Sequence, residues 1–388
     1  MGKISPVGLM LKWARESAKI SLETASKKIN KSTEVIKNWE EEKDFPTYSQ
    51  LEELSKIYRR PLAIFFFPEP PEELDLYKSF RTLPDFELEK LNTSTIFLIR
   101  KAQIMQFNLK ELCKEKNPAP RNILKEFLID IKGNIKEIAQ NLRTYLGITL
   151  EEQFSWKDSR EAFKNWRDIL YSFGIFIFKE PFEQGDISGF CLLDEEFPVI
   201  YVNNSQSDNR KIFTLFHELG HLITGVSGID IKNDDFIEVL TKTDWRIEYL
   251  CNQLTGSVLV PDIDFDKRFN QQHEVDETFI TKLARLYSVS KEVILRKIRD
   301  RNRIDENTFN EYLKKWNKQA LDYKKKRAET SGGPSYYIKK ASYLGEQYID
   351  LVFTRYYREQ INIAEAADYL GIKPINFEKF ENKILLKA

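Results

Sequence analysis

The spacing of hydrophobic residues changes several times along the chain. Through residues 1–67, apolar residues recur every three to four positions in short segments, which predicts a bundle of short helices. Ser21, Ser32 and Thr47 stand directly before three of these segments, where helix N-caps are expected. The stretch 65–73 is rich in proline and glutamate and interrupts the pattern. We therefore expect an N-terminal domain over 1–67, followed by a linker.

The next part of the chain changes from helical to strand-like spacing. Between 74 and 159 the pattern is again helical, with many Lys, Glu and Leu residues, and it predicts a helical connector. Beyond it, three short segments are rich in β-branched and aromatic residues: 174–178, 187–193 and 198–203. These segments predict two or three strands of a small sheet.

Helical spacing returns after the predicted strands. One helix is expected over about 209–224 and another over 245–260. Together with the sheet they predict a domain of helices and strands over 160–325, followed by a helical C-terminal domain over 335–388. The expected class is α+β and mostly helical, with a bundle of short helices at the N-terminus.

Composition and charge limit the binding partners and the cellular location that can be expected of this protein. The chain has 388 residues with 60 Lys and Arg against 60 Asp and Glu, so no overall charge attracts nucleic acid or an anionic membrane. No apolar run approaches the roughly 20 residues that span a bilayer, and the N-terminal segment lacks the apolar core of a signal peptide. The three cysteines are odd in number and far apart, which fits a reducing compartment. We therefore expect a cytoplasmic protein without a membrane segment.

Two of the three histidines form the strongest chemical motif. His217 and His221 lie four residues apart on a predicted helix, and Glu218 follows the first of them. This spacing places both imidazoles on one helix face, where they can bind one zinc ion. Glu218 can then act as a general base on a zinc-bound water. Two buried structural histidines, or a purely structural zinc site, are the alternatives; the motif favours a zinc hydrolase.

A catalytic zinc site requires a third protein ligand. Glu248 is the preferred candidate, because it lies on the helix predicted over 245–260, which has a strong apolar face and small residues downstream. The alternatives are other acidic or histidine side chains: Asp235, Glu238, Asp244 and His273. No oxyanion stabiliser is evident from the spacing, and the candidates for it are Tyr201, Tyr249 and His273.

The segment Phe213–Leu222 and the segment from Glu248 to Pro261 resemble the ImmA/IrrE-type metallopeptidases. That family has the pattern F-T-x-x-H-E-x-x-H, followed by E-x-x-A-N, small residues and a proline. The resemblance covers about 160–300 and implies that the domain over 160–325 is a zincin-like metallopeptidase domain. Cys251 stands where alanine is usual and Leu254 where phenylalanine is usual, and neither position touches the proposed chemistry.

The resemblance implies a specific function. It implies that His217, His221 and Glu248 bind Zn²⁺ and that Glu218 is the catalytic base. It also implies an endopeptidase that cleaves one regulatory protein, often a DNA-binding repressor. Two alternatives stay open: a transcriptional regulator whose zinc domain senses a ligand without cleaving, and self-cleavage near the linker at 68–73.

Residues 9–60 resemble an Xre-type helix-turn-helix domain, with a recognition helix that begins at Thr33. In such domains this helix enters the major groove of double-stranded DNA. Base contacts are expected from Ser32, Thr33, Lys37 and Asn38, and phosphate contacts from Lys27, Lys28 and Lys31. Three consecutive glutamates at 40–42 oppose binding to phosphates. DNA binding therefore competes with a role in homodimerisation or in docking a partner repressor.

Two further segments have part of the helix-turn-helix spacing, 283–294 and 363–371. Helical hairpins with alanine at close contacts often produce this pattern. Both segments are therefore interpreted as packing elements.

Overall fold

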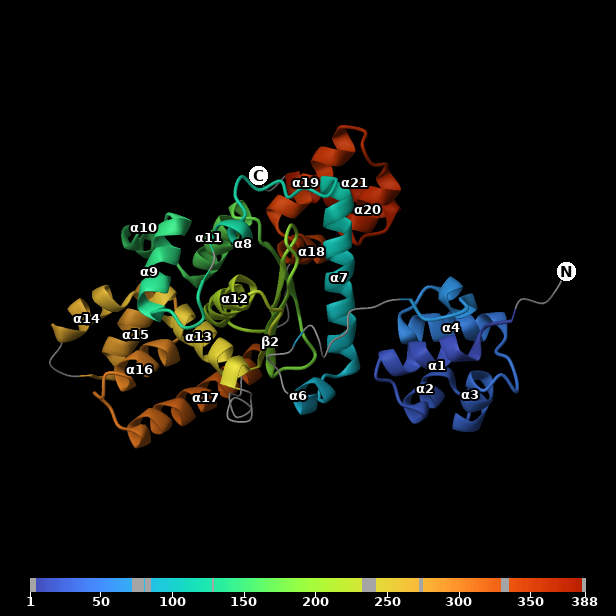
Figure 1. The fold of residues 1–388 in the computed structure, drawn as a ribbon, viewed down its shortest axis with the longest axis horizontal. Coiled ribbons are helices and arrows are strands. Elements are labelled where there is room, and N and C mark those ends of the chain that lie inside the picture. The colour runs from blue at the N-terminus through green and yellow to red at the C-terminus, as the bar shows by residue number, and fades with distance from the viewer. Residues whose placement is uncertain are drawn as a thin grey trace. The chain divides into compact units, whose positions relative to one another are not determined.

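The structure is a computed structural model (Figure 1). It describes residues 5–71, 80, 85–127, 129–231, 242–271, 275–328 and 335–385. The chain is mostly helical and contains one four-stranded mixed sheet, which confirms the expected α+β class. Its contacts divide it into two units, one of residues 1–78 with 85–103 and one of residues 79–84 with 104–388. No helix in the described ranges is both long enough and apolar enough to cross a bilayer.

The first unit contains a bundle of short helices, drawn in blue in Figure 1. They are α1 (Gly8–Ser17), α2 (Leu22–Ile29), α3 (Thr33–Glu40), α4 (Tyr48–Tyr58) and the 3-10 helix η1 (Leu62–Phe66). The side chains of Ser21, Ser32 and Thr47 each accept a backbone N–H bond at the start of the next helix, over 3.2, 3.3 and 3.4 Å. The predicted N-caps are therefore confirmed.

An ion pair joins α1 to α3 beside the apolar core of this bundle. The Arg15 guanidinium donates from Nε to Glu40 Oε1 over 2.6 Å and from Nη2 to Glu40 Oε2 over 2.8 Å. Because Arg15 is buried and the contact is bidentate, the pair fixes the approach of the two helices. α6 (Asp85–Glu89) and the first part of α7 (Thr93–Cys113) also belong to this unit.

The second unit is built on a mixed sheet with the strand order β1-β3-β2-β4. The strands are β1 (Phe176–Glu180), β2 (Ile187–Leu192), β3 (Val199–Asn203) and β4 (Ile229–Ile231). β1 is parallel to β3, whereas β2 is antiparallel to both β3 and β4. The first three strands agree with the predicted segments. β4 was not predicted, because three residues are too few to show an alternating pattern.

Two helices connect the sheet to the candidate site. α12 (Asp208–Ile223) packs against β2, β3 and β4, and α13 (Lys242–Leu259) packs against α12. Gly220 permits the close approach of the two helices, since a Cβ there would lie 2.9 Å from Cys251 Sγ and 3.2 Å from its Cα. Both helices were predicted from the hydrophobic spacing.

Within the described residues, four helices lie between α7 and the sheet along the chain: α8 (Ile123–Glu126), α9 (Ile135–Leu146), α10 (Leu150–Ser155) and α11 (Ser159–Ser172). Buried residues of α8 and α9 share one apolar core with α12 and α13. On α9, the buried Arg143 guanidinium donates to the carbonyl of Val258 on α13 over 2.9 Å and to the Gln153 side chain over 2.7 Å. These bonds hold the C-terminal end of α13 in place.

Further helices follow α13: α14 (Asp262–Asn270), α15 (Glu277–Leu286), α16 (Lys291–Arg299) and α17 (Glu306–Ala328). The C-terminal group consists of α18 (Tyr336–Leu344), α19 (Glu346–Tyr357), α20 (Ile363–Leu370), the 3-10 helix η3 (Pro374–Asn376) and α21 (Phe377–Leu385). α18 packs on β1. The Arg167 guanidinium of α11 donates to the carbonyls of Ser342 and Leu344, over 3.1 and 2.7 Å, and so anchors the end of α18.

Candidate metal centre

α12 carries the histidine pair inside the protein. The helix begins after Ser207, whose hydroxyl accepts the Arg210 backbone N–H over 3.3 Å, and it ends before Gly225, which adopts a φ of +76°. From Lys211 to Ile223 every residue except Phe213 is buried. The polar side chains in this stretch are therefore held within the core.

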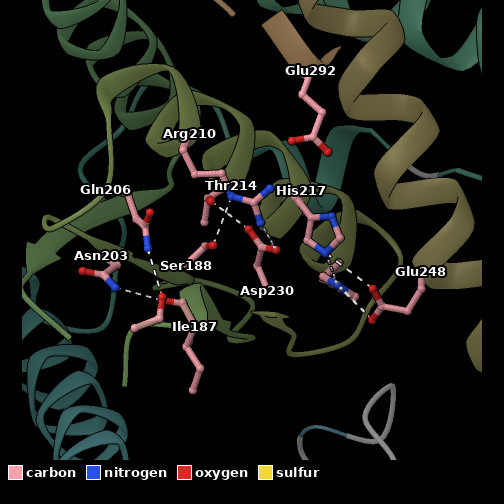
Figure 2. Close-up of polar contacts among 12 residues, drawn as sticks. Ile187, Ser188, Asn203, Gln206, Arg210, Thr214, His217, Asp230, Glu248 and Glu292 are labelled. Atoms are coloured by element: carbon pink, nitrogen blue, oxygen red, sulfur yellow. Dashed lines mark hydrogen bonds and ion pairs between the residues drawn. The ribbon is translucent and has the colours of Figure 1, made fainter. Parts of the chain in front are cut away.

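His217 and His221 converge with Glu248 of α13 (Figure 2). The two Nε2 atoms lie 3.1 Å apart. Glu248 Oε2 lies 3.5 Å from His217 Nε2, and Glu248 Oε1 lies 3.3 Å from His221 Nε2. A tetrahedral zinc ion about 2.1 Å from each ligand atom would separate such atoms by about 3.4 Å. These three side chains therefore fit one zinc ion with a fourth position left for water.

The electrostatics of the three side chains also suit a cation. Burial disfavours the charged imidazoles, but nearby acidic groups outweigh it: Glu248 raises the pKa of His217, and the Cys251 sulfur together with Glu248 raises the pKa of His221. Burial likewise disfavours the Glu248 carboxylate, yet the two imidazoles hold its pKa below its usual value. These side chains thus favour positive charge beside Glu248, and a divalent cation would supply that charge.

Glu218 lies between the histidines and is fully buried. Within the part of the chain that the structure describes, neither of its carboxylate oxygens has a hydrogen bond of good geometry, and the Cys191 thiol is the side-chain donor that interacts with it. Burial raises the pKa of Glu218 to about 7, although both imidazoles act in the opposite direction. A fully buried carboxylate with a pKa near 7 is suited to accept a proton from a water molecule at the centre.

Gly228 shapes the position of one imidazole. A Cβ at this residue would lie 2.3 Å from His221 Cδ2 and 2.8 Å from its Nε2. Since real Cβ atoms do not approach other atoms so closely, any larger residue would displace the His221 ring. Sequence reasoning did not find this contact, because Gly228 and His221 are neighbours only through the fold.

Asp230 on β4 was also missed. Its buried carboxylate accepts hydrogen bonds from Thr214 Oγ1 and from Arg210 Nη2, each over 2.7 Å, and Arg210 Nε donates to Ser188 Oγ over 3.0 Å (Figure 2). This network ties α12 to β2 and β4, and the Asp230 charge helps to raise the pKa of His217. The sequence feature that could have indicated a buried polar partner such as Asp230 is Thr214, which lies one turn before His217 on the apolar helix.

Comparison with known families agrees with these observations. Residues 171–299 match the family model of the IrrE N-terminal-like domain, Peptidase_M78, and residues 11–65 match a helix-turn-helix model, HTH_3. The chain carries an IrrE N-terminal-like domain. No curated protein sequence matches the chain. The IrrE-like domain includes the whole histidine–glutamate cluster, and its family is of metallopeptidase type.

Of the other candidates for a third ligand, Asp244 alone lies among the described residues. Asp235, Glu238 and His273 lie outside the described residues. Asp244 lies one turn before Glu248 on α13 and is absent from the group of ligand atoms that converge in the described part of the IrrE-like domain.

The tyrosine candidates for an oxyanion stabiliser lie in different surroundings. Tyr201 is buried in the sheet, and its ring stacks on Phe190 with centroids 5.3 Å apart. Tyr249 is 45% exposed and stacks on Trp245, one turn earlier on α13. Among the two, only Tyr249 is open to a ligand at the surface of the IrrE-like domain.

The predicted DNA-contact residues lie on the open face of the helix-turn-helix. Ser32, Thr33 and Lys37 are exposed, and Asn38 is half-buried. Ser32 also caps α3, so it has a structural role besides any contact with DNA. Ile36 and Trp39, which alternate with these residues, form the buried face of α3.

The three glutamates that were expected to oppose DNA binding are each engaged within the same unit. Glu40 forms the ion pair with α1 described above. Glu41 contacts the ammonium of Lys43 over 2.6 Å, and Glu42 Oε1 accepts the backbone N–H of Gly8 over 2.8 Å. Arg15 and Lys43 thus offset the charges of Glu40 and Glu41, whereas the neutral backbone N–H of Gly8 leaves the charge of Glu42 in place.

Proposed function

We propose that this protein is a zinc-dependent endopeptidase that cleaves one regulatory protein, a DNA-binding repressor, and that its helix-turn-helix binds DNA or the partner. The observation that carries the proposal is the convergence of His217, His221 and Glu248, with the fully buried carboxylate of Glu218 on the same helix as the two histidines. The match to the IrrE N-terminal-like family supports it. A cytoplasmic location and a homodimer stay predictions from the sequence.

The proposed roles follow from the geometry. His217, His221 and Glu248 would hold zinc, which when bound polarises the scissile carbonyl and lowers the pKa of a water ligand toward ~7. Glu218 accepts the proton that the attacking water loses and delivers it to the leaving amine. Burial raises the pKa of Glu218 to about 7, which suits both the uptake and the delivery of this proton.

An exposed aromatic pair supports a polypeptide substrate. Trp245 and Tyr249 are 41% and 45% exposed, and their rings stack with centroids 5.1 Å apart at an interplanar angle of 10°. They lie on α13 together with Glu248, and Trp245 is one turn before that ligand. An apolar side chain of a bound polypeptide could pack on this surface while the scissile bond reaches the centre.

The proposal is tested with the Glu218→Gln variant. Gln keeps the shape of the side chain but cannot accept the proton. We expect the zinc-loaded wild type to cut its substrate at one site, and the variant to capture the same protein from a cell extract without cutting it. Cleavage that persists in Glu218→Gln, or a zinc-loaded wild type that cuts nothing the variant captures, would overturn the proposal.

A second candidate function is a regulator that senses a small ligand at the zinc centre and does not cleave. The burial of the ligands favours it, because His217, His221 and Glu248 are only 0–3% exposed. This candidate predicts that regulation through DNA is unchanged in Glu218→Gln and is lost when His217→Ala removes the metal. Self-cleavage near residues 68–73 would appear instead as two fragments in the intact mass after zinc is added.

A further inference from the structure

The C-terminal helices repeat the N-terminal helix-turn-helix position by position. α2 and α20 are both eight residues long and follow the N-caps Ser21 and Asn362, which are 341 residues apart (362 − 21). Nine residues after each N-cap the chain adopts a left-handed conformation, at Asn30 with φ 54° and at Gly371 with φ 60°. The first helix and the turn therefore have the same length and geometry.

The buried positions coincide at the same offset. In the N-terminal domain, the core of the helix-turn-helix is formed by Ala25, Ile29, Ile36 and Trp39, which are 0–5% exposed. Their counterparts at an offset of 341 are Ala366, Leu370, Phe377 and Phe380, which are 0–1% exposed. The second helical segment begins as η3, which packs against α20, and continues as α21. The apolar face of α21 packs on α19 and α18, where Phe377 and Phe380 contact the Phe353 ring and Phe380 contacts the Tyr337 ring.

A third helix precedes both pairs. α1 ends four residues before its N-cap, and α19 ends five residues before Asn362. α19 packs against α20, and the Tyr348 hydroxyl of α19 donates to the carbonyl of Tyr369 at the end of α20 over 3.0 Å. The sequence-based interpretation of 363–371 as a simple packing element does not account for this three-helix match.

The helix pair α15–α16 provides an internal control. It has similar spacing, but residues on both faces of α16 are buried: Val293, Ile294, Leu295, Lys297 and Ile298. Within the described residues of α21, by contrast, one face is buried and the other exposes Glu378, Lys379, Asn382 and Lys383. Of these two helices, α21 is the one that presents an exposed face among its described residues, as a recognition helix requires.

Two exposed lysines suit a DNA groove. The counterparts of Ser32 and Asn38 are Lys373 and Lys379, both exposed, whereas the counterpart of Lys37 is the exposed Glu378, whose charge opposes a phosphate contact at that position. Between the two lysines, Ile375 is 84% exposed at the start of the helical segment, where an apolar side chain can contact a thymine methyl group. We propose that residues 362–385 are a second helix-turn-helix and that they bind double-stranded DNA through α21.

This assignment gives the chain a DNA-binding element near each end. One molecule that engages two sites on the same duplex gains affinity through the effective concentration of the second element. The inference does not depend on peptidase activity, since neither helix-turn-helix contains a residue of the zinc centre.

The test uses the full-length chain and a pool of random-sequence DNA duplexes. The first variant, Thr33→Ala/Lys37→Ala/Asn38→Ala, disables the N-terminal element, and it should still enrich a sequence motif. Addition of Lys373→Ala/Ile375→Ala/Lys379→Ala should lower the affinity for that motif by roughly 10-fold or more, because base and phosphate contacts are lost together. Ile375 is so exposed that its truncation removes little packing.

A matched control replaces two exposed lysines outside the proposed interface, Lys132→Ala/Lys136→Ala, and should leave the affinity unchanged. Lys379→Glu alone changes one exposed charge and should weaken binding without affecting the thermal unfolding midpoint. The proposal is overturned if the N-terminal variant enriches no motif, or if the C-terminal substitutions leave the affinity for the enriched motif intact. Capture of a protein in place of DNA by α21 would overturn it as well.

Discussion

α12 and α3 both carry side chains proposed for function, yet they place them in opposite environments. α12 holds His217, Glu218 and His221 inside a helix that is buried almost throughout, whereas α3 buries only Ile36 and Trp39 and exposes its polar residues. An unsatisfied polar group in a core costs about 1–3 kcal/mol, whereas the same group on a surface costs little. A polar residue buried in a core therefore indicates a functional site by itself. An exposed polar residue indicates a binding surface only when the surrounding fold is known.

The same contrast predicts how the two helices respond to mutation. In α12, an isosteric substitution of a polar side chain should change the reactivity of the candidate site, whereas the packing of the helix stays intact. In α3, the buried residues should control stability and the exposed ones should control binding. The four predictions below test this separation, from the largest expected effect to the smallest.

Glu218→Gln should lower the rate of substrate cleavage by roughly 10²–10⁴-fold, because the proposed proton acceptor is lost. Zinc content and the thermal unfolding midpoint should change little, since Glu218 is not one of the converging ligands. Glu115→Gln, at an exposed position, is the matched control. Equal cleavage rates in the two variants would contradict the proposed role of Glu218.

Trp39→Ala should destabilise the N-terminal unit by about 3–5 kcal/mol, because a large buried side chain leaves a cavity in its core. Hydrogen exchange of residues 8–58 should accelerate, and DNA binding should be lost. Zinc binding by α12 and α13 should be unaffected. A loss of zinc in Trp39→Ala would show that the two regions are not independent.

Gly228→Ala should weaken zinc binding by roughly 10–100-fold, because the added methyl group displaces the His221 ring that it would otherwise meet at 2.3 Å. Competition with a chelator measures the change. Gly256→Ala on α13 is the control, since a Cβ there meets no atom within 4 Å and alanine favours a helix. If both variants retain zinc equally, the contact of Gly228 does not position His221.

Lys28→Ala should have the smallest effect. Lys28 is exposed on α2 and is expected to contact a phosphate, so its removal should weaken binding to all duplexes alike and reduce the slope of log affinity against log salt by about 1. Titration at several salt concentrations measures the slope. An unchanged slope would place Lys28 away from the DNA backbone.

The sequence allowed the helices of both regions to be predicted, because their apolar residues recur at helical spacing and their N-caps are clear. The three converging side chains were also named in advance, since His217 and His221 are rare residues in a fixed motif. β4, Asp230 and the contact of Gly228 were not predicted, because a three-residue strand has no period and the contacts form only on folding.

The C-terminal helix-turn-helix shows a related limit. Its alanine and glycine residues have the spacing of a helix-turn-helix, and so do the residues of α15–α16. The spacing alone does not show in which of the two pairs the second helix has an exposed face. Burial of both faces of α16 and exposure of one face of α21 separate the two cases. The domain limits at 67, 160 and 335 stay predictions.

The most direct test of the account is an anomalous-difference map, recorded at the zinc absorption edge from crystals of the purified, zinc-supplied protein. The account predicts one peak per chain, about 2.0–2.2 Å from Nε2 of His217, Nε2 of His221 and a carboxylate oxygen of Glu248. A map without a peak among these atoms, or with zinc held by other residues, would contradict it.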